Sequence, residues 1–357
     1  MQIVSFIVAI LMLVVVWRMW RERNGVIERR VDPAFDPAEG QPEARVALDY
    51  LQAGNWNALT RLYWELAPSD RYHLVQSLGE LAGAAGGPDL PDDADSALLV
   101  MVGGMRLMRG MTFHTSGALG AVVKANAARM VEDLRQADRT LREASLRNPH
   151  DSTSLALQIR LESGGNLDRA HINNLVGRIQ ASGEDNLFAG VNHLLSCRPP
   201  PGGSFGEMWK VANEWANAGP NAAWLAIPAR AHIEEWCSAV ILSPPNAPER
   251  AAMIDLMQDD GFHRHLAKLD DMFWSGLARA NMSGAEGSFA HNHFAFLMHQ
   301  FRLGDRARAH LEKIGPHISR YPWSLMPSGA SAPTRLLSDL RRQYGLPTLP
   351  PPAPARQ

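Results

Sequence analysis

The sequence predicts an all-α protein: an array of helical hairpins (an α-solenoid) that follows one N-terminal transmembrane helix. Three observations predict it. The first residues form a long apolar run, and most later segments carry apolar residues at three- and four-residue spacing. Segments rich in Val, Ile and Thr with period two, which would indicate strands, are absent.

The apolar run comes first, from Met1 to Trp20, and Ser5 is the only polar side chain between Ile3 and Trp17. About 20 residues at ~1.5 Å each span the ~30 Å of bilayer hydrocarbon, so this run is long enough to cross. A buried core helix is the alternative, but such a helix would normally have a polar face. The predicted membrane-anchor residues are Ile3, Phe6, Leu11, Leu13, Trp17, Arg18, Trp20, Arg21 and Arg23.

Flanking charge predicts the orientation of this helix. The arginines of the region all lie on its C-terminal side, so the positive-inside rule places the N-terminus outside and the C-terminal body in the cytoplasm. No cationic stretch precedes the apolar run and no small-residue cleavage site follows it, unlike in a signal peptide. Alanine- and arginine-rich usage suggests a bacterium, and hence the inner membrane. The arginines either only set the topology or also bind anionic lipid.

Composition shifts divide the chain into four parts. The transmembrane helix occupies residues 1–20, and a basic juxtamembrane segment with a proline-rich linker occupies 21–42. The all-α repeat-like domain is expected over 43–325. A short helix and a disordered proline-rich tail are expected over 326–357.

Within the body, apolar spacing and Gly, Asn or Asp breaks predict fourteen helices in order. The first seven are Glu43–Ala53, Asn57–Leu66, Tyr72–Leu81, Ser96–Met108, Lys124–Arg147, Thr153–Ser163 and Asp168–Ala181. The others are Leu187–Leu195, Gly206–Asn217, Asn221–Cys237, Pro248–Gln258, Phe262–Met282, Phe289–Arg302 and Arg306–Gly315.

One segment has the spacing of a tetratricopeptide second helix: Ala137, Leu141, Ala144 and Pro149 place small, large, small and proline residues in the expected order. The next helix departs from that pattern. A second hairpin of similar kind is expected over 289–315. The predicted array is therefore tetratricopeptide-like but degenerate.

Several segments in this order resemble those of one bacterial family. They are Arg106–Gly110, the helix ending at Asn148-Pro149, Cys197–Trp209, Ala229–Trp236 and the hairpin ending near Pro322-Trp323. Together, over roughly residues 44–323, they resemble the uncharacterised family catalogued as domain of unknown function 4034. The chain departs from it at Met108-Arg109-Gly110, where a tryptophan is expected, and at Arg198, which begins an Arg-Pro-Pro-Pro run instead of Lys-Trp-Gly. The resemblance implies a tetratricopeptide-like fold and no established activity.

Composition argues against several classes of function. The formal net charge is −2 and the body has no long basic block, so nucleic acid is not an expected partner. The two cysteines lack the CxxC spacing of zinc or redox sites. Phosphate-binding glycine loops, HExxH and EF-hand motifs are absent from the sequence, and we expect no cofactor.

One serine motif has two interpretations. Gly202-Gly-Ser204-Phe-Gly206 matches the G-x-S-x-G pattern of a hydrolase nucleophile, which requires a preceding strand. A helix and prolines precede Ser204 instead. Ser204 and Glu207 fit a helix-capping box, which is the favoured interpretation.

The candidate binding residues lie on two neighbouring predicted helices: Trp209, Trp215, Trp224, His232, Glu235 and Trp236. The tryptophans either pack between helices or anchor a partner peptide. His232 and Glu235 share one helix face, a spacing used in helical di-metal sites, but no matching ExxH motif is present. A hydrogen-bonded histidine is the simpler interpretation, also for the pair His291 and His293, whose side chains point to different sides.

The leading functional prediction is a membrane-tethered scaffold or protein-interaction module with a membrane-associated protein partner. Enzymatic activity is the less favoured prediction; the enzyme would be helical, in a metal-dependent or metal-free form, with a site between helices near His232 and Glu235 that includes His291 and His293. A structural subunit of an envelope machine is a third possibility. Fixed stoichiometry in a purified complex would distinguish it.

Overall fold

The computed structural model describes residues 35–82, 90–115, 121–164, 167–199, 202–277, 282–315, 317–326 and 333–348. These ranges are helical and contain no strand, so the predicted all-α class is confirmed. No helix within them is long and apolar enough to cross a bilayer. The predicted transmembrane helix with its nine anchor residues, most of the linker and the end of the proline-rich tail lie outside the described ranges.

The helices follow one another with mostly short connections. The first eight are α2 (Pro42–Gln52), α3 (Trp56–Glu65), α4 (Pro68–Ala82), α5 (Ser96–Thr115), α6 (Ala121–Arg147), α7 (Ser152–Gly164), α8 (Arg169–Ser182) and α9 (Leu187–Ser196). The next are α10 (Phe205–Ala218), the 3₁₀ turn η2 (Ala222–Leu225), α11 (Ala226–Trp236), the π-helical turn η3 (Cys237–Leu242), α12 (Pro248–Leu256) and α13 (Asp260–Leu277). The last are α14 (Gly284–Gln300), α15 (Gly304–Ile314), α16 (Arg320–Trp323) and α17 (Pro333–Gln343).

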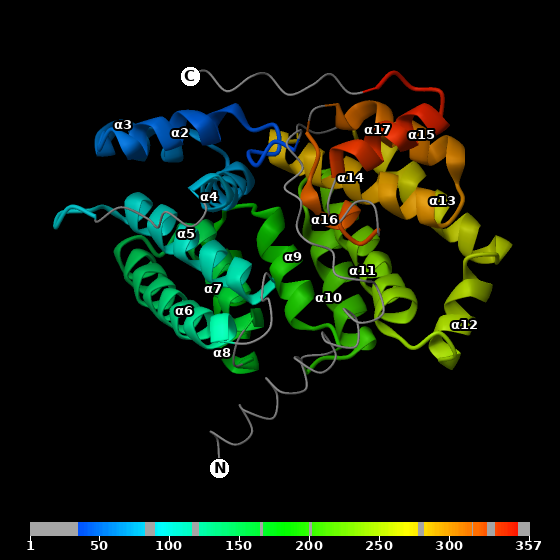
Figure 1. Ribbon diagram of the computed structural model, residues 1–357, viewed down its shortest axis with the longest axis horizontal. Coiled ribbons are helices and arrows are strands. Elements are labelled where there is room, and N and C mark those ends of the chain that lie inside the picture. The colour runs from blue at the N-terminus through cyan, green and yellow to red at the C-terminus, as the bar shows by residue number, and fades with distance from the viewer. Residues whose placement is uncertain are drawn as a thin grey trace, which may run out of the picture.

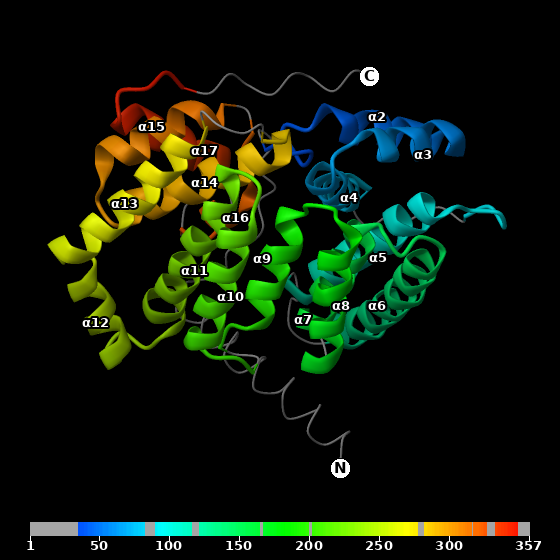
Figure 2. The same cartoon turned by 180° about the vertical axis from the view of Figure 1, so that it is seen from behind.

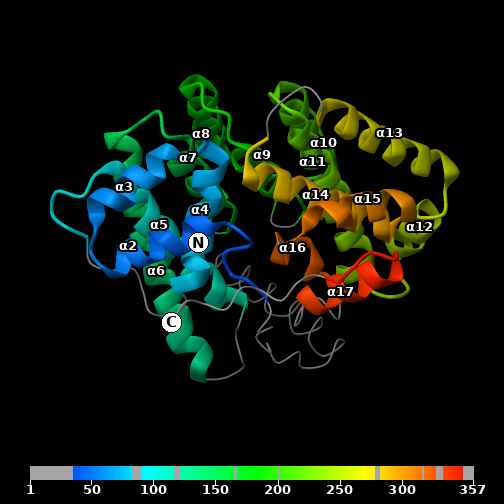
Figure 3. The same cartoon turned by 90° about the horizontal axis from the view of Figure 1, so that it is seen from above.

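Helix α9 lies between two groups of helices. Figure 1 shows α2 to α8 on one side of it and α10 to α17 on the other, and the view from above in Figure 3 shows the same division. Figure 2 shows α9 from behind, between α7 and α8 on one side and α10 and α11 on the other. Most sequential neighbours pack as pairs, including α5 with α6 and α14 with α15.

Four helices from both groups begin at the same end of the molecule: α4, α7, α9 and α14. Their first residues are joined by polar contacts, because Ser69 Oγ accepts the Leu187 N–H at 3.0 Å and Asp70 Oδ1 accepts the Ala285 N–H at 2.8 Å. The Thr153 hydroxyl donates to the Pro68 carbonyl at 3.3 Å. The positive ends of four helix dipoles therefore meet in one place, which favours carboxylates there.

Most predicted helices match within about two residues at their ends, but one is divided. The expected helix Asn221–Cys237 consists of η2, α11 and η3. Pro228 explains the first division, because proline has no N–H to donate to the Trp224 carbonyl in a continuous helix. In the observed arrangement Pro228 lies in the first turn of α11, where no such donor is needed.

Several other boundaries differ from the prediction by more than two residues. Helix α4 begins at Pro68 rather than Tyr72, α5 extends to Thr115 rather than Met108, α6 begins at Ala121 rather than Lys124, and α13 is described to Leu277 rather than Met282. Helix α14 begins at Gly284 rather than Phe289, because Ser283 and Glu286 form a capping box. The expected break at Gly304-Asp305 lies in the first turn of α15 instead. The turn is made just before it, where Arg302 has a positive φ of 61°.

The packed body extends beyond its predicted limits at both ends. Ala38 is buried, and Glu39 accepts a hydrogen bond from the Arg320 backbone N–H at 2.9 Å, so the end of the expected linker belongs to the body. In the C-terminal segment, Leu336, Leu337 and Leu340 of α17 are buried. The short helix predicted after residue 325 therefore packs against the body, where it contacts α15 and α16.

Candidate functional site

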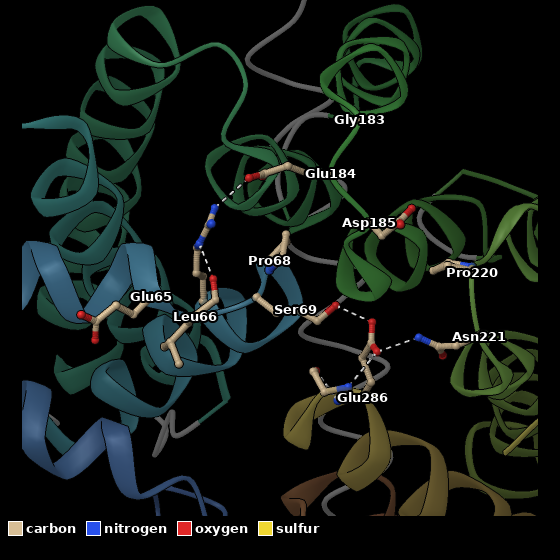
Figure 4. A pocket seen from close by; sticks show the side chains of 13 residues that line it. Glu65, Leu66, Pro68, Ser69, Gly183, Glu184, Asp185, Pro220, Asn221 and Glu286 are labelled. Carbon is tan, nitrogen blue, oxygen red and sulfur yellow. Dashed lines mark hydrogen bonds and ion pairs between the residues drawn. The ribbon is translucent and has the colours of Figure 1, made fainter. Parts of the chain in front are cut away.

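An open cleft of about 750 Å³ lies where the N-termini of α4, α9 and α14 meet. Figure 4 shows its walls: the α3–α4 turn, the α8–α9 turn, the α10–η2 turn and the start of α14. We call it the acidic cleft. It is lined by Glu65, Leu66, Ala67, Pro68, Ser69, Arg71, Gly183, Glu184, Asp185, Pro220, Asn221, Ser283 and Glu286.

Negative charge exceeds positive charge in this lining, with four carboxylates against one arginine. Arg71 is already occupied: its Nη1 contacts Glu184 at 2.9 Å, and its Nε donates to the Leu66 carbonyl at 2.9 Å. Its guanidinium also lies 4.8 Å from the ring centre of Trp64. The Arg71–Glu184 pair is thus internally neutralised and leaves the cleft with excess negative charge.

Glu286 forms part of the cleft floor and is buried. Its carboxylate accepts hydrogen bonds from the Ser69 hydroxyl at 2.9 Å, the Asn221 amide at 3.0 Å and the Ser283 N–H at 3.1 Å. These bonds join α4, η2 and α14 through one side chain. The floor is therefore a satisfied polar network.

Asp151, just before α7, lies behind the cleft wall. It is buried and accepts a hydrogen bond from the Tyr63 hydroxyl at 2.7 Å. Burial raises the pKa of Asp151 to about 6; the Tyr63 bond lowers it and the charge of Glu184 raises it. Arg71 lies 3.8 Å away, so protonation of Asp151 alters the charge balance beside the cleft.

Glu65 and Asp185 differ from the other two acids because they are exposed. Glu65 ends α3 and Asp185 lies in the α8–α9 turn; in Figure 4 Glu65 lies at the outer edge of the cleft, with its carboxylate pointing away from Ser69 and Glu286. No described residue pairs with either carboxylate. Both are therefore available to a cation that approaches the cleft.

The sequence-predicted binding residues lie elsewhere, on α10 and α11. Three of them are brought together: Trp209 Nε1 donates to Glu235 Oε1 at 2.7 Å, and the Trp209 and His232 ring centres are 4.5 Å apart. Phe262 contacts the other side of His232, at 5.2 Å between ring centres. Burial lowers the pKa of His232 to about 3, with a contribution from His265, so this imidazole is neutral near pH 7.

The other three tryptophans of this set are buried. Trp215 stacks with Trp224 at 5.6 Å between ring centres and donates to His193 Nδ1 at 3.1 Å. Trp236 packs edge-to-face against Phe296. These contacts match the interpretation of interhelical packing, and of the four candidate tryptophans only Trp209 is partly exposed.

The histidines expected around an enzymatic site belong to different networks. His291 contacts His310, with 2.9 Å between their Nδ1 atoms, and His310 contacts Asp270 at 2.7 Å. His293 lies on the other side of α14, where Arg230 Nη1 approaches its Nε2 at 3.3 Å. Neither joins the His232 cluster. Within the described ranges, no three His, Cys, Asp or Glu side chains are placed to hold a metal ion.

Ser204 is the N-cap of α10, as its capping interpretation predicts. Its Oγ accepts the Glu207 N–H at 3.2 Å, and residues in non-helical conformation, not a strand, precede it. The geometry required of a hydrolase nucleophile is therefore not present at this serine.

Sequence reasoning missed the acidic cleft, although one signal was present: the Gly183-Glu184-Asp185 break places two acids beside a helix start. No family model matches the chain, and no curated protein or solved structure does either. The geometry of the described residues thus has to carry any functional proposal.

Proposed function

We propose that the chain is a membrane-tethered protein-interaction module, with a tetratricopeptide-like array of hairpins whose acidic cleft binds a Lys- or Arg-rich segment of a membrane-associated partner. One observation carries this proposal. Two exposed, unpaired carboxylates, Glu65 and Asp185, belong to the lining of a cleft of about 750 Å³. That volume falls in the ~300–1,000 Å³ range typical of ligand sites.

The surroundings of these carboxylates support the same chemistry. The floor residue Glu286 is held by three hydrogen bonds from separate elements, so the cleft does not need to reorganise before binding. Arg71 and Glu184, which also line the cleft, form an ion pair and so neutralise each other. A basic segment therefore meets negative charge without displacing an internal ion pair, which favours a positively charged occupant.

The proposed tether adds proximity to this affinity. If residues 1–20 span the inner membrane and the body lies in the cytoplasm, the cleft meets membrane-associated partners at a high effective concentration. A weak cleft interaction is then sufficient, because each exposed ion pair contributes only ~0.2–1 kcal/mol. The same tether fits a scaffolding role.

The test uses defined peptides and the full-length protein in detergent. A fluorescent peptide with alternating lysines and small residues is titrated against wild type and against Glu65→Lys/Asp185→Lys. We expect saturable binding to wild type that weakens with added salt, and a loss of roughly 10-fold in affinity in the double variant. A peptide with glutamates in place of the lysines should not bind.

The matched control is Glu249→Lys/Asp255→Lys on α12, which makes the same change in net charge at two exposed positions far from the cleft (Figure 2). It should bind the basic peptide nearly as well as wild type. Equal losses in both double variants would mean that net charge, rather than the cleft, controls binding, and the proposal would fail.

A separate experiment addresses the tether. Membranes from cells expressing the full chain, or a form lacking residues 1–20, are washed at alkaline pH and assayed for the protein. We expect the full chain to stay in the membrane pellet and the shortened chain to be released. Release of the full chain would contradict the tether and leave the cleft proposal standing.

A further inference from the structure

A second charged region is formed by residues of α7, of α11 and of the end of α9, which packs against both helices, and it contains three arginines. Arg160 is on α7, Arg198 follows the end of α9, and Arg230 is on α11, one turn before Glu234. We call these four residues the guanidinium cluster. Its formal charge is opposite in sign to that of the acidic cleft.

Glu234 is the one carboxylate of this cluster, and both of its oxygens accept hydrogen bonds. Arg230 donates through Nε at 2.7 Å and contacts Oε1 through Nη2 at 2.6 Å, and the Tyr321 hydroxyl donates to the same oxygen at 2.9 Å. Arg198 donates to the other oxygen at 2.7 Å. Three of these four donors contact Oε1 and one contacts Oε2, so both oxygens of Glu234 are engaged by Arg230, Tyr321 and Arg198.

Arg160 is the unmatched member. No described residue accepts a hydrogen bond from its guanidinium or forms an ion pair with it, although the side chain is at least half-buried. Burial lowers the pKa of Arg160, and the charges of Arg230 and Arg198 lower it further, while Tyr72 and Glu234 oppose them. Helix α7 packs against α9 and α9 packs against α11, so the three arginines belong to one set of packed helices that holds Glu234 as their anion.

The other titratable groups near the cluster do not supply negative charge. Burial raises the pKa of Tyr72, Tyr321 and Cys237, the last to about 12, so all three are neutral near pH 7. Burial and Arg230 lower the pKa of His293 to about 3, and its imidazole is neutral too. The described residues therefore leave two positive charges uncompensated.

Uncompensated charge away from bulk water is unfavourable, and an anion of matching charge removes the penalty. Guanidinium groups donate in a planar fork that fits phosphate oxygens, and a phosphate monoester carries close to two negative charges at pH 7. The Arg198 side chain is 41% exposed, which leaves the cluster reachable from solvent. Glu234 holds Arg198 and Arg230 in place, so a ligand would meet donors that are already oriented.

We propose that the guanidinium cluster is a binding site for a phosphate group as its dianion, with Arg160 as the free donor and Arg198 and Arg230 as donors held by Glu234. The phosphate comes either from free phosphate or a small phosphate ester, or from the headgroup of a phosphatidic acid-like lipid. This site is independent of the acidic cleft and does not rest on the proposed function.

Isothermal titration calorimetry with inorganic phosphate tests the site in the full-length protein in detergent. Wild type should bind with one-to-one stoichiometry. Arg160→Gln, which leaves every bond to Glu234 intact, should weaken binding by roughly 10- to 100-fold, as expected for loss of a charged hydrogen-bond donor. Arg160→Lys retains the positive charge but lacks the planar guanidinium donors, so its phosphate affinity should lie between those of wild type and Arg160→Gln.

The matched control is Arg135→Gln on α6, an exposed arginine that pairs with no described residue; it should bind phosphate as wild type does. Acetate, a monoanion, should bind more weakly than phosphate. The proposal is overturned if wild type shows no saturable phosphate binding, if Arg160→Gln binds as tightly as wild type, or if acetate matches phosphate.

A soluble short-chain phosphatidic acid distinguishes the two sources. Binding more than tenfold tighter than inorganic phosphate, and lost in Arg160→Gln, would identify a lipid headgroup site. Binding equal to or weaker than inorganic phosphate, with the phosphate result retained, would identify a site for free phosphate or a small ester. Thermal unfolding of each variant without ligand checks that the fold is intact, and added phosphate should raise the Tm of wild type by mass action.

Discussion

The acidic cleft and the guanidinium cluster are connected by the same helices but are built in different ways. Helix α9 begins at the cleft, and α7 begins behind the cleft wall. Arg198 lies just after the C-terminal end of α9, and Arg160 lies toward the C-terminal end of α7. Since α9 has ten residues, the two regions are about 15 Å apart along its axis. Glu184 and Asp185 precede the positive end of the α9 dipole and Arg198 follows its negative end, so the direction of α9 favours the sign of charge in each region.

The two regions also differ in how charge is balanced. In the cleft, Glu286 is held by a hydroxyl, an amide and a backbone N–H, all uncharged donors. In the cluster, Glu234 is held mainly by Arg198 and Arg230. Removal of one hydrogen-bond partner of Glu286 should therefore lower the free energy of unfolding less than removal of one partner of Glu234, where a charge would be left unpaired.

Acidification should produce the largest effect, and it acts through buried histidines of α9, α11 and α14. Burial lowers the pKa of His193 to about 4 and of His232, His291 and His293 to about 3, against an unfolded value near 6.5. The unfolded chain takes up these protons first, so stability is full above pH ~6.5 and falls as the pH decreases toward these values. With four histidines, the free energy of unfolding changes by at most about 5 kcal/mol per pH unit. Urea unfolding at several pH values measures it, and a flat profile between pH 7 and 5 would refute it.

Removal of the cluster carboxylate should have the next largest effect. Glu234→Gln keeps the shape of the side chain but leaves three arginines without an anion. In the wild type, burial alone would raise the pKa of Glu234, but Arg230 and Arg198 lower it to about 2, so the charged carboxylate is strongly favoured. We expect the free energy of unfolding to fall by ~3–5 kcal/mol at pH 7. The exposed control Glu214→Gln should change it by under ~0.5 kcal/mol in the same urea experiment.

Asp151, at the cleft, should respond to pH with the opposite sign to the histidines. Its folded pKa of about 6 is above the ordinary aspartate value of 3.8, so the folded state binds the proton more tightly and this group stabilises increasingly as pH falls from 6 to 4. Asp151→Asn removes that compensation, and stability should fall more steeply on acidification than in wild type. The difference amounts to about 3 kcal/mol at most. Identical pH profiles for the two proteins would show that the Asp151 pKa is not raised.

The smallest effect is expected for a neutral partner in the cleft. Ser69→Ala removes the hydroxyl that donates to Glu286 and accepts the Leu187 N–H. Because Glu286 keeps two other donors, we expect a loss of about 1–2 kcal/mol in the free energy of unfolding. A loss as large as that of Glu234→Gln would show that the two regions do not differ in charge balance.

Local signals explain why the helices could be predicted. Helix α9 was predicted over Leu187–Leu195 and spans Leu187–Ser196. Its start was predictable because Asn186 caps it, and Cys197 follows its last turn. Gly183 ends α8 in a left-handed conformation, as a glycine break predicts. The Ser283 and Glu286 capping box was also present in the sequence, but the predicted helix began after it.

The charged regions could not be predicted in this way, because their members come from distant helices. Arg160, Arg198 and Glu234 share no motif, and only tertiary packing brings them together. Proximity in sequence was also a poor guide for the tryptophans. Trp209 and Trp215 are six residues apart, about 240° around a helix, so they face different neighbours.

The two hydrogen bonds that join His291, His310 and Asp270 determine which imidazole nitrogens carry a proton. Burial lowers the pKa of His310, so the ring is neutral, and its Nε2 must carry hydrogen to donate to the Asp270 carboxylate. Its Nδ1 is then a lone pair that accepts the hydrogen on His291 Nδ1. Both tautomers are thereby fixed, and His291 is left with a lone pair on Nε2. Nitrogen chemical shifts should show two neutral imidazoles with opposite tautomers joined by one shared hydrogen.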